Sequence, residues 1–185
     1  MPIFSTRNQN KMTHTSNYSE KEIILPAKGW FIILSLIIGL LLNLLPIQGY
    51  LLILRPDFVA LVLLFWGIYQ PERVGISIAF IMGLLMDVVS SSMFGQHALA
   101  YSVLIFIALI LRRRIHTFGL LKQVPQVGLL LCFTQFIILL TELLKRSDFP
   151  GWHYFLASLT GMLLWPLISL VLEIPHGSKY GPNAL

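Results

Sequence analysis

Residues 74–95 read VGISIAFIMGLLMDVVSSSMFG, an apolar run that contains one acidic residue and ends in serines and a glycine. Small or acidic side chains recur in it at every fourth position: Gly75, Ala79, Gly83, Asp87, Ser91 and Gly95. A spacing of four keeps side chains on one face of an α-helix. In lipid, a face of small residues lets the backbone of a second helix approach closely. The run therefore predicts a membrane helix that packs against another helix, either in this chain or in a partner protein.

The composition of the whole chain indicates a membrane protein. Hydrophobic residues make up 56% of the 185 residues and charged residues only 11%, against roughly 25% charged residues in soluble domains. So few charges cannot cover so much apolar surface in water, so lipid has to cover it. The excess of 13 basic over 8 acidic residues lies between apolar runs and comes without a groove-reading motif, which argues against nucleic-acid binding.

Six apolar runs predict an all-α, six-helix transmembrane bundle. We expect the spans at residues 29–45, 51–70, 74–90, 97–111, 124–144 and 152–172, each near the length that a roughly 30 Å hydrocarbon core requires. Pro46, Pro71, Gly95, Pro125 and Pro150-Gly151 are the expected turn residues. The predicted domains are a polar, disordered cytoplasmic tail at 1–28, the transmembrane domain at 29–173, and a short cytoplasmic tail at 174–185.

The basic residues predict the orientation of the bundle. With six spans, ten lysines and arginines fall on the side of the two tails: Arg7, Lys11, Lys21, Lys28, Arg73, Arg112, Arg113, Arg114, Lys122 and Lys179. Three fall on the other side: Arg55, Lys145 and Arg146. Basic residues in short loops stay in the cytoplasm. We therefore expect both termini in the cytoplasm. The cluster 112–114 fits a stop-transfer anchor, or a site for anionic lipid or a cytoplasmic partner.

Charged residues inside the spans are the candidates for function. Asp87 lies twelve residues after Gly75, about 18 Å into the membrane, where a carboxylate is costly without a partner. Arg55, Pro56 and Asp57 open the second span at a similar depth. Pro56 and Asp57 suit the first turn of a helix. Arg55 is then the expected counter-ion of Asp87.

The remaining polar residues predict structural roles. Trp165-Pro166 predicts a kink or a break in the last span, because proline removes a backbone hydrogen bond. Glu142 is expected to pair with Lys145 or Arg146 one turn later. His97 is expected to be solvated or interfacial, and Cys132 to be a small core residue.

No motif in the chain predicts catalysis. The sequence has no H-E-x-x-H, no G-x-S-x-G and no phosphate-binding glycine loop, and its histidines have no metal-ligand spacing. We expect no enzyme activity, cofactor or metal. A transport or small-molecule binding subunit with an outward pocket near Arg55 and Asp87 stays open, because such a site needs only a few polar groups at mid-depth.

Several segments in order resemble the MreD family of rod shape-determining membrane proteins over most of residues 28–172. The resemblance lies in Leu54-Arg55-Pro56-Asp57-Phe58, in Leu64-Phe65-Trp66, in Gln70-Pro71-Glu72-Arg73-Val74, in Gly83-Leu84-Leu85-Met86-Asp87, in Gly95 and in Leu164-Trp165-Pro166. Residues 90–92 are serines where the family pattern has a glycine, and the polar N-terminal tail is longer than usual.

The resemblance implies a non-enzymatic, inner-membrane scaffold subunit of the bacterial cell-elongation machinery, the elongasome. It implies partners of the MreC type, and the RodA glycosyltransferase with its transpeptidase, directly or through MreC. MreB filaments would be indirect partners. It also implies a fold similar to the substrate-binding subunits of energy-coupling-factor transporters, which is one basis of the transport alternative.

Overall fold

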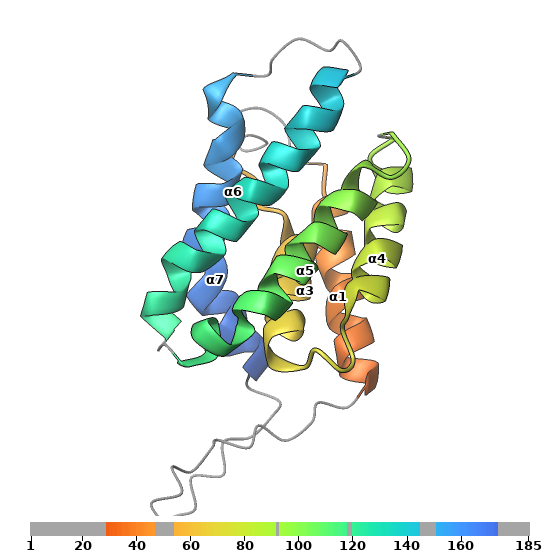
Figure 1. Ribbon diagram of the computed structural model, residues 1–185. Coiled ribbons are helices and arrows are strands. Elements are labelled where there is room, and N and C mark those ends of the chain that lie inside the picture. The colour runs from red at the N-terminus through yellow and green to blue at the C-terminus, as the bar shows by residue number, and fades with distance from the viewer. Residues whose placement is uncertain (1–28, 47–53, 92, 118–119, 145–150, 174–185) are drawn as a thin grey trace, which may run out of the picture.

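The computed structural model describes residues 29–46, 54–91, 93–117, 120–144 and 151–173. The two predicted tails lie outside these ranges. The described residues form α-helices and a short 3-10 turn, without a strand: α1 (Gly29–Leu44), α3 (Phe58–Tyr69), α4 (Ile76–Val89), α5 (Gln96–Thr117), α6 (Leu120–Leu144), η1 (Trp152–Phe155) and α7 (Leu156–Glu173) (Figure 1). The predicted all-α, six-helix fold is confirmed.

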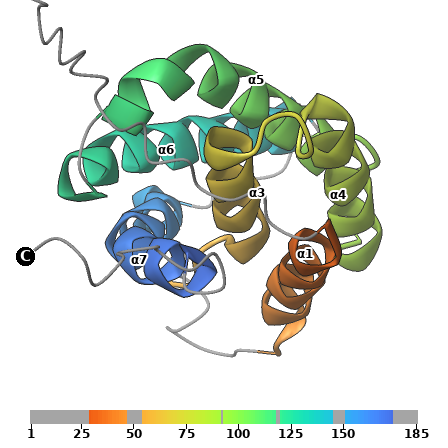
Figure 2. The ribbon, with the colours of Figure 1, turned by 90° about the horizontal axis from the view of Figure 1, so that it is seen from below.

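Helix α3 is the centre of the bundle. It contains no charged residue, and ten of its twelve residues are buried. A helix that is apolar on all sides is stable only when neighbours surround it. Helices α1, α5 and α7 contact it (Figure 2). The ring of Trp66 is buried in the core and packs edge-on against Phe65. The short α3 therefore organises the helices around it.

The helices differ in length from the predicted spans. Three helices contain segments long and apolar enough to cross a membrane, in Gln96–Arg113, Lys122–Leu144 and Leu156–Glu173, and the apolar helices α1, α3 and α4 are shorter. Their 16, 12 and 14 residues correspond to about 24, 18 and 21 Å. Part of the second predicted span, residues 51–53, lies outside the described residues.

Two predicted boundaries are wrong. Helix α5 does not end at Leu111 but continues through the arginines to Thr117, because long basic side chains leave the helical backbone intact while their charged ends reach water. Pro125 was expected in a turn, but it lies inside α6. It falls in the second turn, where a proline removes a single backbone hydrogen bond and the 25-residue helix continues.

The outer surface of the bundle is apolar. Large hydrophobic side chains on every helix except α3 are more than one-third exposed, including Trp30, Ile81, Ile110, Leu129 and Leu163. In water, such a surface would drive aggregation, whereas lipid covers it without cost. The exposed leucines and isoleucines therefore mark the membrane-facing side of the bundle.

The predicted small-residue face packs inside the chain. Ala79, Gly83 and Asp87 are buried on α4, and α5 lies alongside (Figure 1). A Cβ atom added to Gly83 would lie 2.3 Å from the Cα atom of Ala98, so the two backbones touch there. Gly75 precedes α4 as its N-cap. Ser91 and Gly95 have φ angles of 51° and 95° in the α4–α5 turn, a conformation that glycine adopts easily.

We expect Gly83→Ala to destabilise the bundle by about 1–3 kcal/mol, because the methyl group would force α4 and α5 apart. Gly75→Ala is the matched control, because its added Cβ would have its nearest neighbour at 3.8 Å. Thermal unfolding of the full chain in mild detergent measures the difference. Equal melting temperatures for the two variants would show that the helices do not touch at Gly83.

Candidate functional site

Asp57 joins two helices at the start of α3. Its Oδ1 atom accepts a hydrogen bond from the backbone N–H of Ala60 at 3.0 Å and one from the amide of Asn43 at 2.9 Å. The Oδ1 atom of Asn43 accepts the N–H of Phe58 at 3.0 Å. Two side chains thus satisfy the first N–H groups of α3, which have no partner within the helix. The cap also fixes the end of α1, where Asn43 lies.

A third helix reaches the same carboxylate. The hydroxyl of Tyr101, on α5, donates a hydrogen bond of 2.6 Å to Oδ2 of Asp57, and Tyr101 is fully buried. Hydrogen bonds to a charged acceptor are short and strong. Asp57 is therefore the point at which α1, α3 and α5 are tied together.

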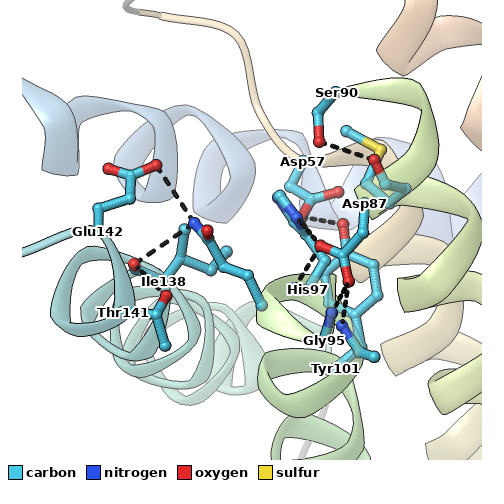
Figure 3. A network of polar contacts seen from close by, with 12 residues as sticks. Asp57, Asp87, Ser90, Gly95, His97, Tyr101, Ile138, Thr141 and Glu142 are labelled. Atoms are coloured by element: carbon cyan, nitrogen blue, oxygen red, sulfur yellow. Dashed lines mark hydrogen bonds and ion pairs between the residues drawn. The ribbon is translucent and has the colours of Figure 1, made fainter. Parts of the chain in front are cut away.

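Asp87 performs the same role at the start of α5 (Figure 3). Its carboxylate accepts the backbone N–H groups of Gly95 and His97, both at 2.8 Å, and that of Ala98 at 3.4 Å. The Nδ1 atom of His97 lies 2.8 Å from Oδ1 of Asp87, whose side chain is fully buried. A negative charge at a helix N-terminus is stabilised by the helix dipole and by the free N–H groups.

The predicted Arg55–Asp87 ion pair is wrong. The guanidinium of Arg55 donates to the carbonyl oxygens of Leu42 and Leu45, each at 3.1 Å. These carbonyls lie at the C-terminal end of α1, where they have no partner within the helix and carry the negative end of its dipole. Arg55 therefore closes α1, whereas Asp87 is neutralised by the beginning of α5.

We call Asn43, Asp57, Asp87, His97 and Tyr101 the polar cluster. The rings of His97 and Tyr101, one turn apart on α5, have centroids 5.8 Å apart, which connects the Asp87 contacts to the Asp57 contacts. Of the two predicted positions for His97, solvated or interfacial, the solvated one is wrong, because the side chain is only 13% exposed and contacts Asp87. Sequence reasoning also missed Asn43 and Tyr101. A polar residue at the end of an apolar run is the one signal that could have indicated Asn43.

The other predicted polar residues hold helices together as well. Glu142 accepts a hydrogen bond of 3.2 Å from Gln96, and the predicted partners Lys145 and Arg146 lie outside the described residues. The indole of the buried Trp165 donates to Gln123 at 3.4 Å. Helix α7 continues through Pro166, so the predicted break is absent.

The polar cluster has the features of a structural clamp. Each carboxylate is occupied by hydrogen bonds from its own chain. Within the described ranges, no group of three or more His, Cys, Asp or Glu residues could hold a metal ion. The cluster can thus fix the positions of α1, α3, α4 and α5.

Residues 27–174 match the family model of the rod shape-determining protein MreD. The chain belongs to the MreD family. It is 33% identical over 149 residues to the rod shape-determining protein MreD of Haemophilus influenzae, covering 78% of this chain and 90% of the relative. No solved structure matches the chain, so the similarity to energy-coupling-factor subunits stays an expectation. Membership in the MreD family supports a role in determining rod shape and a location in a membrane.

We expect Asp87→Asn to destabilise this MreD-family chain by about 2 kcal/mol or more. The amide NH₂ would point a donor at backbone N–H groups and leave at least one of them unsatisfied. Glu72→Gln is the control, because it removes a carboxylate that is exposed in the turn before α4. Chemical unfolding in detergent compares the two variants. A loss of stability no larger than that of Glu72→Gln would contradict the capping role of Asp87.

Double-mutant cycles separate the real partner of Asp87 from the predicted one. We expect the effects of Asp87→Ala and His97→Ala on the free energy of unfolding to be non-additive by about 1 kcal/mol or more, because the two side chains touch. The effects of Asp87→Ala and Arg55→Ala should add to within about 0.5 kcal/mol. Strong coupling of Asp87 to Arg55 would restore the ion pair.

Proposed function

We propose that this chain is a non-enzymatic scaffold subunit of the bacterial elongasome, in which it helps to organise lateral peptidoglycan synthesis. Its proposed partners are a membrane-anchored protein of the MreC type, and the RodA glycosyltransferase with its transpeptidase, bound directly or through MreC. MreB filaments would be reached indirectly. The rod shape-determining role of the family is the basis of the proposal.

The contacts of the two carboxylates in the polar cluster carry the proposal. Asp87 is the acidic group expected to line a mid-depth site, and both Asp87 and Asp57 are bonded to helix N-termini and to side chains of the chain itself. A transporter site needs polar groups that a substrate can reach. Groups committed to internal contacts serve a rigid shape, which is what a scaffold contributes.

The transport alternative loses its predicted site. That hypothesis placed an outward pocket beside Arg55 and Asp87, but Arg55 binds the end of α1 and Asp87 the start of α5. The structure has a groove elsewhere, between α5 and α6, and the surface of that groove is apolar. The observed contacts therefore favour the scaffold over a polar-substrate carrier.

We also propose an inner-membrane location with six spans and both termini in the cytoplasm. The ten-to-three distribution of basic residues supports this orientation. The start of α1, the α3–α4 turn, the end of α5, the start of α6 and the end of α7 lie at one end of the bundle (Figure 1), which agrees with an even number of crossings. Reporter fusions at the two termini test the orientation. Reporters on opposite sides would overturn it.

The scaffold hypothesis predicts that rod shape depends on correct folding of the chain and not on any single polar group of the polar cluster. Tyr101→Phe removes one hydroxyl from Asp57 and keeps the buried ring. We expect cells with this variant to stay rod-shaped as long as the protein accumulates to wild-type levels. Gly83→Leu should lose both its accumulation and the rod shape, because a bulky side chain separates α4 and α5.

Co-purification distinguishes the two functions. After mild-detergent purification at native expression, the scaffold predicts an MreC-type protein bound to wild type and to Tyr101→Phe alike. A saturable small ligand that Tyr101→Phe fails to bind, with rounded cells despite normal folding, would favour the transport alternative. Rod shape and partner binding lost together in a well-folded Tyr101→Phe would also contradict the scaffold, since this variant leaves the outer surface unchanged.

A further inference from the structure

An apolar groove lies on the outer surface between α5 and α6. It has a volume of about 550 Å³ and is lined by Ile107 and Leu111 of α5 and by Leu129, Cys132, Phe133 and Phe136 of α6, among others. The volume is that of a small-molecule site, but no polar atom contributes to its surface, whereas sites for polar ligands contain a few placed polar groups. The groove therefore suits hydrocarbon.

The length of the groove corresponds to one leaflet. Its lining extends along α6 from Gln126 to Phe136, ten residues or about 15 Å. The hydrocarbon core of a bilayer is roughly 30 Å thick. A groove of this length accommodates the acyl chain of a phospholipid from the leaflet at the α5–α6 end of the bundle.

The side chains of the groove favour an acyl chain over a partner helix. Helices that associate in lipid approach through small residues, and none of the lining residues is a glycine, alanine, serine or threonine. The glycine of α6, Gly128, faces Met162 of α7 instead. Leu129 and Phe133 are 71% and 44% exposed, so the groove is open to lipid. A flexible acyl chain can fit between these bulky side chains.

Basic residues lie at the end of the groove that a lipid head group would occupy. Lys122 is exposed, and it precedes Gln126 by four residues and Leu129 by seven, a spacing that keeps all three on one face of α6. On α5, Arg112, Arg113 and Arg114 follow Leu111 directly, and the helix continues through them. Arg112 is used within the bundle, where it donates to the carbonyl of Ile68 at 2.8 Å.

We propose that the α5–α6 groove binds one anionic phospholipid, with an acyl chain along Leu129 and Phe133 and the head-group phosphate at Lys122. Anionic head groups bind basic clusters at the membrane surface. The inference rests on the groove and its charged end, and it holds whether or not the chain acts as a scaffold. It gives Lys122 a role beyond that of orienting the bundle.

Native mass spectrometry of the full chain tests the head-group site. The protein is delipidated, incubated with vesicles of phosphatidylglycerol or of phosphatidylcholine with the same acyl chains, and extracted in mild detergent. We expect one phosphatidylglycerol to be retained in preference to phosphatidylcholine. Lys122→Gln should reduce this preference about fivefold, whereas Arg73→Gln, in the turn between α3 and α4, should leave it unchanged. Equal retention of the two lipids, or equal effects of the two variants, would overturn the proposal.

Blocking the groove tests the acyl-chain site. Cys132→Trp places an indole in the groove and should abolish retention of phosphatidylglycerol, while Leu163→Trp adds the same side chain to an exposed position on α7 and should not. If Cys132→Trp does not fold, Ile107→Phe fills the groove from α5. Retention of the lipid in a folded groove variant contradicts the proposal.

Photo-crosslinking in native membranes separates a lipid from a protein occupant. A photoreactive residue at Phe133 should give an adduct of the mass of a phospholipid. A protein-sized adduct at Phe133 would show that a partner helix fills the groove and would overturn the lipid assignment. Because this readout is independent of rod shape and of MreC binding, its failure is distinguishable from failure of the scaffold.

Discussion

The fold depends on two carboxylates placed at the beginnings of helices. Asp57 caps α3 and Asp87 caps α5, and each also binds a side chain from α5. A charge inside a membrane is costly, but here the compensating charge is the positive end of a helix dipole together with its free N–H groups. The same contacts that neutralise the carboxylates fix the positions of four helices, so the polar cluster and the packing of the bundle are one feature.

Arginines complete the arrangement at the opposite helix ends. Arg55 binds the last carbonyls of α1 and Arg112 binds a carbonyl near the end of α3. Helices α1 and α3 have only 16 and 12 residues, about 24 and 18 Å, which is shorter than a hydrocarbon core of roughly 30 Å. Internal caps replace the water that longer helices would meet at the membrane surface.

The part of the fold that follows from apolar runs is predictable from the sequence. The all-α class and the six helices were found in that way, and the small-residue spacing of Gly75 to Gly95 indicated close packing of α4. Contacts between distant residues were not predictable. Arg55 was assigned to Asp87 because opposite charges at similar depth attract, but helix ends compete for charged groups equally well, and a single sequence does not show which end lies nearer. The burial of Tyr101 and the contact of His97 with Asp87 follow from the path of α5 through the bundle. The position of a residue along its own helix does not reveal that path.

The contact between Gly83 and Ala98 has a consequence for how the chain enters the membrane. Helices α4 and α5 are joined by a turn of a few residues, and their contacts are local in sequence, which allows them to form early. If they insert as a hairpin, Asp87 enters the bilayer already bound to the N–H groups of Gly95 and His97. The cost of carrying a lone carboxylate across hydrocarbon is then avoided, and biogenesis proceeds by pairs of helices rather than one helix at a time.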